Sequence, residues 1–174
     1  METALILVIA VLQSIGVSLG VGSSTIAISQ FFVAIADGQI DPSERRLMGV
    51  VYIVLRVAMG LILATSLAHM AFVMYVLNLQ NMSLSEYWNP FTAGLWVIVA
   101  VLFANAVAMT KHWIPSNLGP GIQAGSWYTL GIMFALVSVG LVGFSYAQFG
   151  LAYAGMIVLF IAIVNGVMSH LKKS

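Results

Sequence analysis

The chain alternates between long apolar stretches and short polar breaks. Five apolar stretches cover about 3–36, 46–79, 91–113, 122–145 and 149–171. A helix that crosses the hydrocarbon core of a membrane needs about 20 mostly apolar residues. Each stretch reaches that length. The pattern therefore predicts an all-α, polytopic membrane helix bundle with five transmembrane helices, forming a single domain over residues 1–174.

The breaks contain residues that begin or end helices. In the first break, Asp41 suits an N-cap, Pro42 suits the first helical position and Glu44 completes a capping box. The break at 114–121 contains two prolines and two glycines, which the interior of a helix does not tolerate. We therefore expect a helix to begin at Pro42 and a loop to separate the third and fourth helices.

The first two stretches are longer than a membrane requires. About 34 residues at 1.5 Å each give a helix of about 51 Å, against a hydrocarbon core of about 30 Å. We expect this hairpin to tilt strongly, to project beyond the membrane or to break. In the first stretch, Gly16, Gly20 and Ser24 recur every fourth residue. This ridge of small side chains predicts close helix packing.

Composition supports a membrane location. Hydrophobic residues make up 61% of the chain and charged residues only 6%, whereas soluble domains carry about 25% charged residues. The net charge of +1 is too small to attract nucleic acid. The absence of cysteine excludes disulfides and thiolate metal sites. We predict a multi-pass protein of the cell membrane whose partner is the lipid bilayer and not nucleic acid.

The few charges predict an orientation. With five crossings, the Lys and Arg residues in the breaks and at the ends of the apolar stretches all fall on one side, namely Arg45, Arg46, Lys111, Lys172 and Lys173. The other side carries acidic residues and no Lys or Arg. The positive-inside rule then places the N-terminus outside and the C-terminus in the cytoplasm. Aromatic residues fit the two interfaces, Tyr87 and Trp88 outside and Trp113 and Trp127 inside.

Arg56 is the only Lys or Arg in the interior of an apolar stretch, away from its ends. An ionisable residue within a membrane is a candidate for function. Counted from Tyr52 at the interface, Arg56 lies about 6 Å deep, but counted from Met48 it lies about 12 Å deep. The shallow position permits snorkelling or a pair with Asp37. The deeper position favours a charge that binds an anionic ligand.

Other polar residues fall at a common depth. Those about 8–10 Å from the predicted cytoplasmic ends are Gln30, Asn105, Thr129 and Asn165. Such residues form either hydrogen bonds between helices or the wall of a polar cavity. We treat them as candidate ligand-binding residues, together with His69 in the outer half of the second stretch.

His112 and His170 lie at the same predicted boundary on different helices. Two histidines at one level are what bis-histidine ligation of haem b requires. Histidines beside interfacial residues also occur without any ligand. The chain has no HExxH spacing and no carboxylate within an apolar stretch, so we predict no metal site and no catalytic residue.

The stretch from Leu12 to Glu44 contains GVSLGVGSST followed by ADGQIDPSE. It resembles the first helical hairpin of small uncharacterised prokaryotic integral membrane proteins. The resemblance covers about a fifth of the chain and rests on a glycine-rich helix, an Asp-Gly turn and an acidic cap. It implies a prokaryotic membrane source and no particular activity.

Three functions follow as hypotheses. The first is a non-enzymatic membrane protein that binds or transports a small solute or lipid group through the polar layer near Arg56. The second is a structural or accessory subunit of a homo-oligomer or a larger membrane complex, suggested by the long hairpin and the small-residue ridge. The third is a haem b electron carrier that uses His112 and His170.

Overall fold

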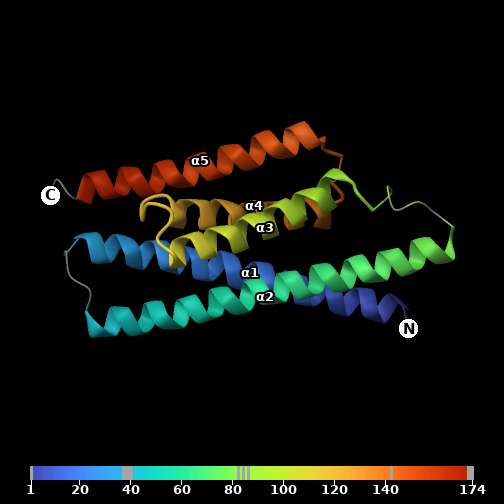
Figure 1. Ribbon diagram of the computed structural model, residues 1–174, viewed down its shortest axis with the longest axis horizontal. Helices are drawn as coiled ribbons and strands as arrows, with labels where there is room; N and C mark the ends of the chain where they lie inside the picture. Colours follow the sequence, from blue (N-terminus) through green and yellow to red (C-terminus); the bar gives the residue numbers. More distant parts are fainter. Residues whose placement is uncertain are drawn as a thin grey trace.

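The protein folds into antiparallel helices. The computed structural model describes residues 2–36, 41–81, 83, 85, 87–141 and 143–171. Its helices pack in alternating directions, and the two termini lie at opposite ends of the bundle (Figure 1). The predicted all-α bundle is confirmed. The helices are α1 (Glu2–Ala36), α2 (Pro42–Leu79), α3 (Pro90–Thr110), α4 (Gly119–Ser138) and α5 (Tyr146–Leu171).

The prediction of five transmembrane helices is confirmed only in part. Among the described residues, four helices are long and apolar enough to cross a membrane, namely α1, α2, α3 and α5. The predicted fourth span, about 122–145, is instead the 20-residue helix α4, which does not meet that standard. Glycine, serine, threonine and glutamine in its first half dilute its apolar character.

The surroundings of α4 explain its composition. It packs against α1, α3 and α5, and ten of its residues are buried. Two of its glycines let α5 approach closely: a Cβ at Gly121 would lie 2.8 Å from Ile161 Cα, and one at Gly125 would lie 2.9 Å from Ile157 Cα. A helix covered by other helices faces protein instead of lipid, so small and polar side chains serve it for close packing.

Residues with left-handed backbone end two of the helices earlier than predicted. The third apolar stretch extends to 113, but α3 ends at Thr110 because His112 takes a φ of 56°. The fourth extends to 145, but α4 ends at Ser138 because Gly140 takes a φ of 77°. Apolarity continues past both points, so hydropathy alone did not locate these ends.

The start of α2 is as predicted, and Glu44 Oε2 accepts a hydrogen bond from the Asp41 backbone N–H at 3.0 Å.

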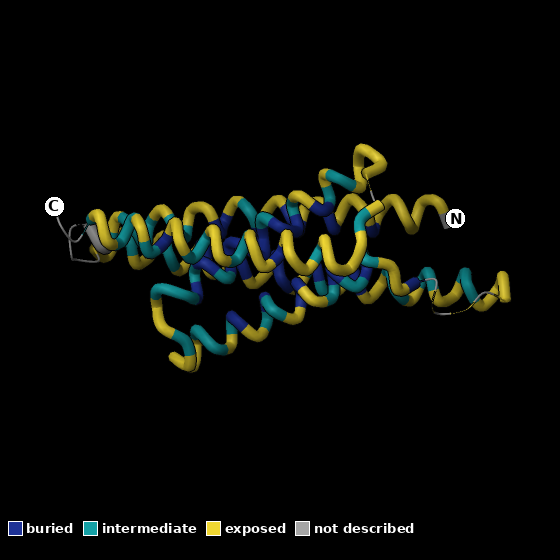
Figure 2. Tube along the Cα trace, turned by 90° about the horizontal axis from the view of Figure 1, so that it is seen from above, coloured by how far each residue is buried: buried dark blue, intermediate teal, exposed yellow. Residues whose placement is uncertain are grey.

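The hairpin of α1 and α2 is longer than the rest of the bundle. The two helices have 35 and 38 residues, which corresponds to about 52 and 57 Å. They lie side by side without a break, and α2 extends well past α3 and α4 at the N-terminal end (Figure 1). Buried residues concentrate in the middle of the bundle, while its outer surfaces are mostly exposed (Figure 2). The long hairpin therefore projects beyond the packed core.

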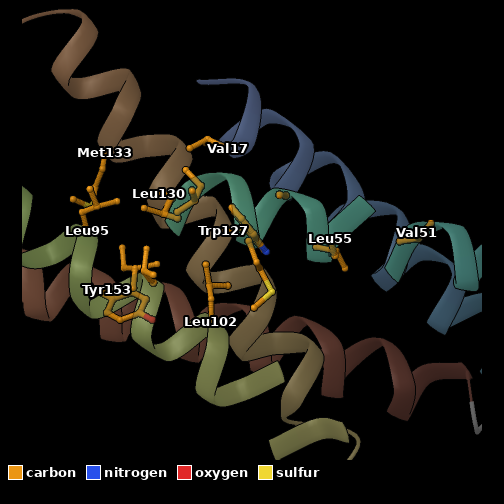
Figure 3. Close-up of a cluster of buried hydrophobic side chains, with 14 residues drawn as sticks. Val17, Val51, Leu55, Leu95, Leu102, Trp127, Leu130, Met133 and Tyr153 are labelled. Carbon is orange, nitrogen blue, oxygen red and sulfur yellow. The ribbon is translucent and has the colours of Figure 1, made fainter. Parts of the chain in front are cut away.

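The core forms around Trp127 of α4. Its side chain is fully buried among apolar residues of α1, α2 and α3, including Val17, Leu55 and Leu102 (Figure 3). The prediction that Trp127 belongs to an interfacial belt is therefore wrong. Trp113, by contrast, is 73% exposed, which suits an interface.

Candidate functional site

A cavity of about 430 Å³ lies at the end of the bundle that carries the C-terminus. This volume falls within the range of small-molecule sites. The second half of α1, the first half of α2 and the end of α3 line it, and the loop 111–118 and the start of α4 complete it. Its polar lining residues are Ser24, Tyr52, Arg56, Thr110, His112, Ser116 and Gln123. We call this space the Arg56 cavity.

Arg56 is the charged side chain of this cavity. It lies on α2, one turn after Tyr52, so the two side chains share a face of the helix. The residue is exposed, and no described residue forms an ion pair with it. The predicted partner Asp37 lies outside the described residues. The guanidinium is therefore available to a ligand from outside the protein.

His112 lines the same cavity from the loop after α3. The backbone turn at the end of α3 places it there: its N–H donates to Met109 O at 3.2 Å, and the N–H of Trp113 donates to Ala108 O at 2.9 Å. Its side chain is exposed and has no hydrogen bond to any described residue. The structure thus brings His112, a candidate haem ligand, to the same cavity as Arg56.

Gln123 of α4 closes the inner part of the cavity and is buried. Its Oε1 accepts a hydrogen bond from Asn105 Nδ2 at 3.0 Å, and the same nitrogen donates to Gly119 O at 3.0 Å. Its Nε2 lies 3.9 Å from Met59 Sδ, a long and weak contact. Asn105 therefore does not line the cavity but holds Gln123 in place, with an amide N–H of Gln123 facing only a soft acceptor.

The other predicted polar residues lie outside the Arg56 cavity. Asn165 of α5 accepts a hydrogen bond from Asn117 Nδ2 at 2.8 Å and so ties the loop 111–118 to α5. Thr129 donates to Gly125 O of its own helix at 2.7 Å. Gln30 is half-buried near the end of α1. These predicted residues thus make separate contacts, and their common depth in the membrane stays a prediction.

His69 lies far from this cavity, in the second half of α2. It is half-buried, and its ring centroid lies 6.4 Å from that of Tyr87. The buried Tyr87 in turn accepts a hydrogen bond from Trp96 Nε1 at 3.0 Å. His69, Tyr87 and Trp96 form an aromatic cluster at the N-terminal end of the bundle, separate from Arg56.

His170 lies in the last turn of α5 and is exposed. It does not line the Arg56 cavity, whereas His112 does. No group of three or more histidine, aspartate or glutamate side chains comes together in the part of the chain that the structure describes. Haem ligation by the two histidines stays an alternative hypothesis that spectroscopy can test.

The small-residue ridge of α1 packs within the chain. A Cβ at Gly16 would lie 3.2 Å from Ile62 Cγ1 of α2, and one at Gly20 would overlap the indole of Trp127. Ser24, one turn later, is buried and lines the cavity. The ridge is therefore filled by side chains of α2 and α4.

Sequence reasoning did not propose four of the polar lining residues, namely Tyr52, Thr110, Ser116 and Gln123. Tyr52 was treated only as a marker of the interface, and Gln123 lay near the start of the predicted fourth helix. A signal for Gln123 existed, because it is a lone amide beside the glycines of α4.

Comparison with models of known protein families, with curated proteins and with solved structures finds no match to this chain.

Proposed function

We propose that this multi-pass membrane protein binds the anionic group of a small solute or lipid in the Arg56 cavity. The observation that carries the proposal is an arginine that lines a cavity without an ion-pair partner among the described residues. An unpaired charge is costly near or within a membrane. A bound anion would offset that cost and complete the site.

The other lining residues support an anion over a cation. Tyr52, Ser24 and Gln123 can all donate hydrogen bonds, and none of the described residues that line the cavity is a carboxylate. Arginine presents a planar fork of donors that matches carboxylate and phosphate groups. The site is therefore complementary to an oxyanion.

The side of the membrane follows from topology. We propose that α4 also crosses the membrane, inside the ring of its neighbours, which gives five crossings with the N-terminus outside. Supporting this, α3 and α5 run in the same direction and α4 connects them along the length of α3 (Figure 1). The start of α2, with Arg45 and Arg46, and the loop 111–118, with Lys111, then lie together in the cytoplasm. The Arg56 cavity lies at this end of the bundle.

A binding measurement tests the proposal. The purified protein, in nanodiscs of phosphatidylcholine, is titrated calorimetrically with octyl phosphate and with the uncharged octanol. We expect octyl phosphate to bind and Arg56→Gln to weaken binding by about 10- to 100-fold, the range of a charge-assisted hydrogen bond. Arg46→Gln is the matched control, because it removes the same charge outside the cavity and should leave affinity unchanged. Equal affinity in both variants would reject the site.

An accessory subunit is the second candidate. Small residues at Ala10, Ser14 and Ser18 lie exposed along a shallow groove of α1, on a face different from the buried Gly16 and Gly20. Such a face suits contact with another transmembrane helix. Native mass spectrometry tests this candidate. An oligomer or heteromer that dissociates in the Ser14→Leu variant supports an accessory subunit. A monomer, both in gentle detergent and in native membranes, rejects it.

A further inference from the structure

In the described part of the chain, three helices are followed by a residue with left-handed backbone. The residue is Asn81 after α2 with a φ of 53°, His112 after α3 with a φ of 56° and Gly140 after α4 with a φ of 77°. Glycine and asparagine are the usual residues at this position. A histidine there meets the steric cost of its Cβ. His112 is therefore the unusual member of the set.

The turn itself does not need a histidine. After α3, residues His112 and Trp113 donate backbone hydrogen bonds to Met109 O and Ala108 O. After α4, Gly140 donates to Val137 O at 3.0 Å and Leu141 donates to Leu136 O at 2.9 Å. The two hydrogen-bond patterns are the same, and glycine completes the second one. The backbone turn alone therefore does not call for an imidazole at position 112.

The surroundings of the imidazole indicate a role for it. His112 lines the Arg56 cavity from the side of the loop, while Arg56 lines it from α2. Neither side chain has a hydrogen-bond partner among the described residues. Two nitrogen-bearing side chains thus reach one cavity from different elements with their hydrogen-bonding groups unused.

The remaining lining of the cavity is largely apolar. It includes Phe31, Leu55 and Ile114 and three methionines, which are Met48, Met59 and Met109. Methionine side chains adapt to flexible apolar ligands. A small inorganic anion would leave this surface unfilled, whereas an alkyl chain would cover it.

We propose that Arg56 and His112 together bind the head of an amphiphilic oxyanion, a phosphate or carboxylate with an alkyl chain, and that the methionine-lined part of the cavity holds the chain. This inference rests on the proposed function and specifies its ligand. The amphiphile is either a free single-chain compound or the head and chain of a membrane lipid.

The test measures affinity and stability in the same variants, in nanodiscs of phosphatidylcholine. His112→Gly should weaken octyl phosphate binding about tenfold, as loss of one hydrogen bond to a charged group does. The same variant should not lower the melting temperature, and relief of the left-handed strain should raise it by about 2–4 °C. His112→Asn keeps a donor and tolerates this backbone conformation, so its affinity should be intermediate. A folding defect would instead lower both quantities.

The outcomes separate this inference from the proposed function. If Arg56→Gln weakens binding and His112→Gly does not, His112 is not a ligand-binding residue and the proposed function stands. If neither weakens binding, the proposed function fails as well. If inorganic phosphate binds as tightly as octyl phosphate, the alkyl chain plays no part and the amphiphile is rejected.

A further pair of nanodiscs distinguishes the two sources of the ligand. Phosphatidic acid replaces a minor part of the phosphatidylcholine, and the titration with octyl phosphate is repeated. Weaker apparent affinity would show that the lipid competes for the cavity and supports a membrane source. Unchanged affinity would reject that source in favour of a free amphiphile.

Discussion

Gly20 of α1 lies directly against the indole of Trp127 of α4, and a Cβ at Gly20 would overlap the ring. The contact joins two residues that are over a hundred positions apart in the chain. Trp127 lies in the buried core of the bundle (Figure 3). The same core contains Leu55, one residue before Arg56.

We predict that Gly20→Ala destabilises the protein. The added methyl group must displace a buried, rigid indole, and overpacking of this kind costs about 1–3 kcal/mol. Gly22→Ala is the matched control, because a Cβ there meets nothing within 4 Å and alanine favours helix by up to about 1 kcal/mol. Thermal unfolding followed by circular dichroism should show a lower midpoint for the first variant only. Equal midpoints would mean that α1 does not approach Trp127.

We predict that Asn105 and Gln123 are energetically coupled. Asn105→Leu leaves Gln123 Oε1 and Gly119 O without their donor, which costs about 1–3 kcal/mol for a buried group. Replacing both amides with leucine removes the unpaired oxygen of Gln123 and should recover part of that loss. The free energies of unfolding of the two single variants and the double variant give the coupling. Strict additivity would contradict the hydrogen bond between the two side chains.

We predict that the two loops flanking α4 lie on opposite sides of the membrane. The chain has no cysteine, so single cysteines at Ser116 and Ser145 can be labelled without background. A membrane-impermeant maleimide applied to intact cells should label Ser145→Cys and not Ser116→Cys. Cysteines at Ser43 and Asn78, on either end of α2, serve as the inside and outside references. Labelling of both loops from one side would show that α4 does not cross.

We predict that the purified protein has no Soret band. His112 lines the Arg56 cavity and His170 does not, and axial ligands of haem normally lie on facing helices within a bundle. An absorption spectrum of protein expressed with added haem precursor decides the question. A Soret band lost on substitution of either histidine would establish the electron-carrier hypothesis in place of the anion site.

The sequence predicted the helices better than their ends and their neighbours. Apolar stretches located all five helices, and the Asp41–Glu44 cap located the start of α2, because both signals are local. The ends of α3 and α4 were missed because the left-handed residues His112 and Gly140 lie within apolar sequence. Trp127 was misplaced because the sequence shows its residue type and the helix that carries it. The sequence does not show which other helices surround that side chain.

For the site, charge was informative and spacing was not. Arg56 stood out because only 6% of the residues are charged, and the structure places it in a cavity. The depth argument for Asn105 and Asn165 did not predict their partners, and both form hydrogen bonds outside the cavity. Gln123 and Tyr52 joined the cavity only through the packing of α2 against α1 and of α4 against α3.

The most direct measurement is the distance between the bound anion and the Arg56 guanidinium. The chain has three arginines, so protein labelled with ¹⁵N-arginine gives few signals, and Arg56→Gln identifies the one that matters. With octyl phosphate bound, solid-state ³¹P–¹⁵N dipolar recoupling should show phosphorus within hydrogen-bonding range of the Arg56 nitrogens, and the effect should vanish in Arg56→Gln. Bound octyl phosphate with no coupling to Arg56 would contradict the assignment of the Arg56 cavity as an anion site.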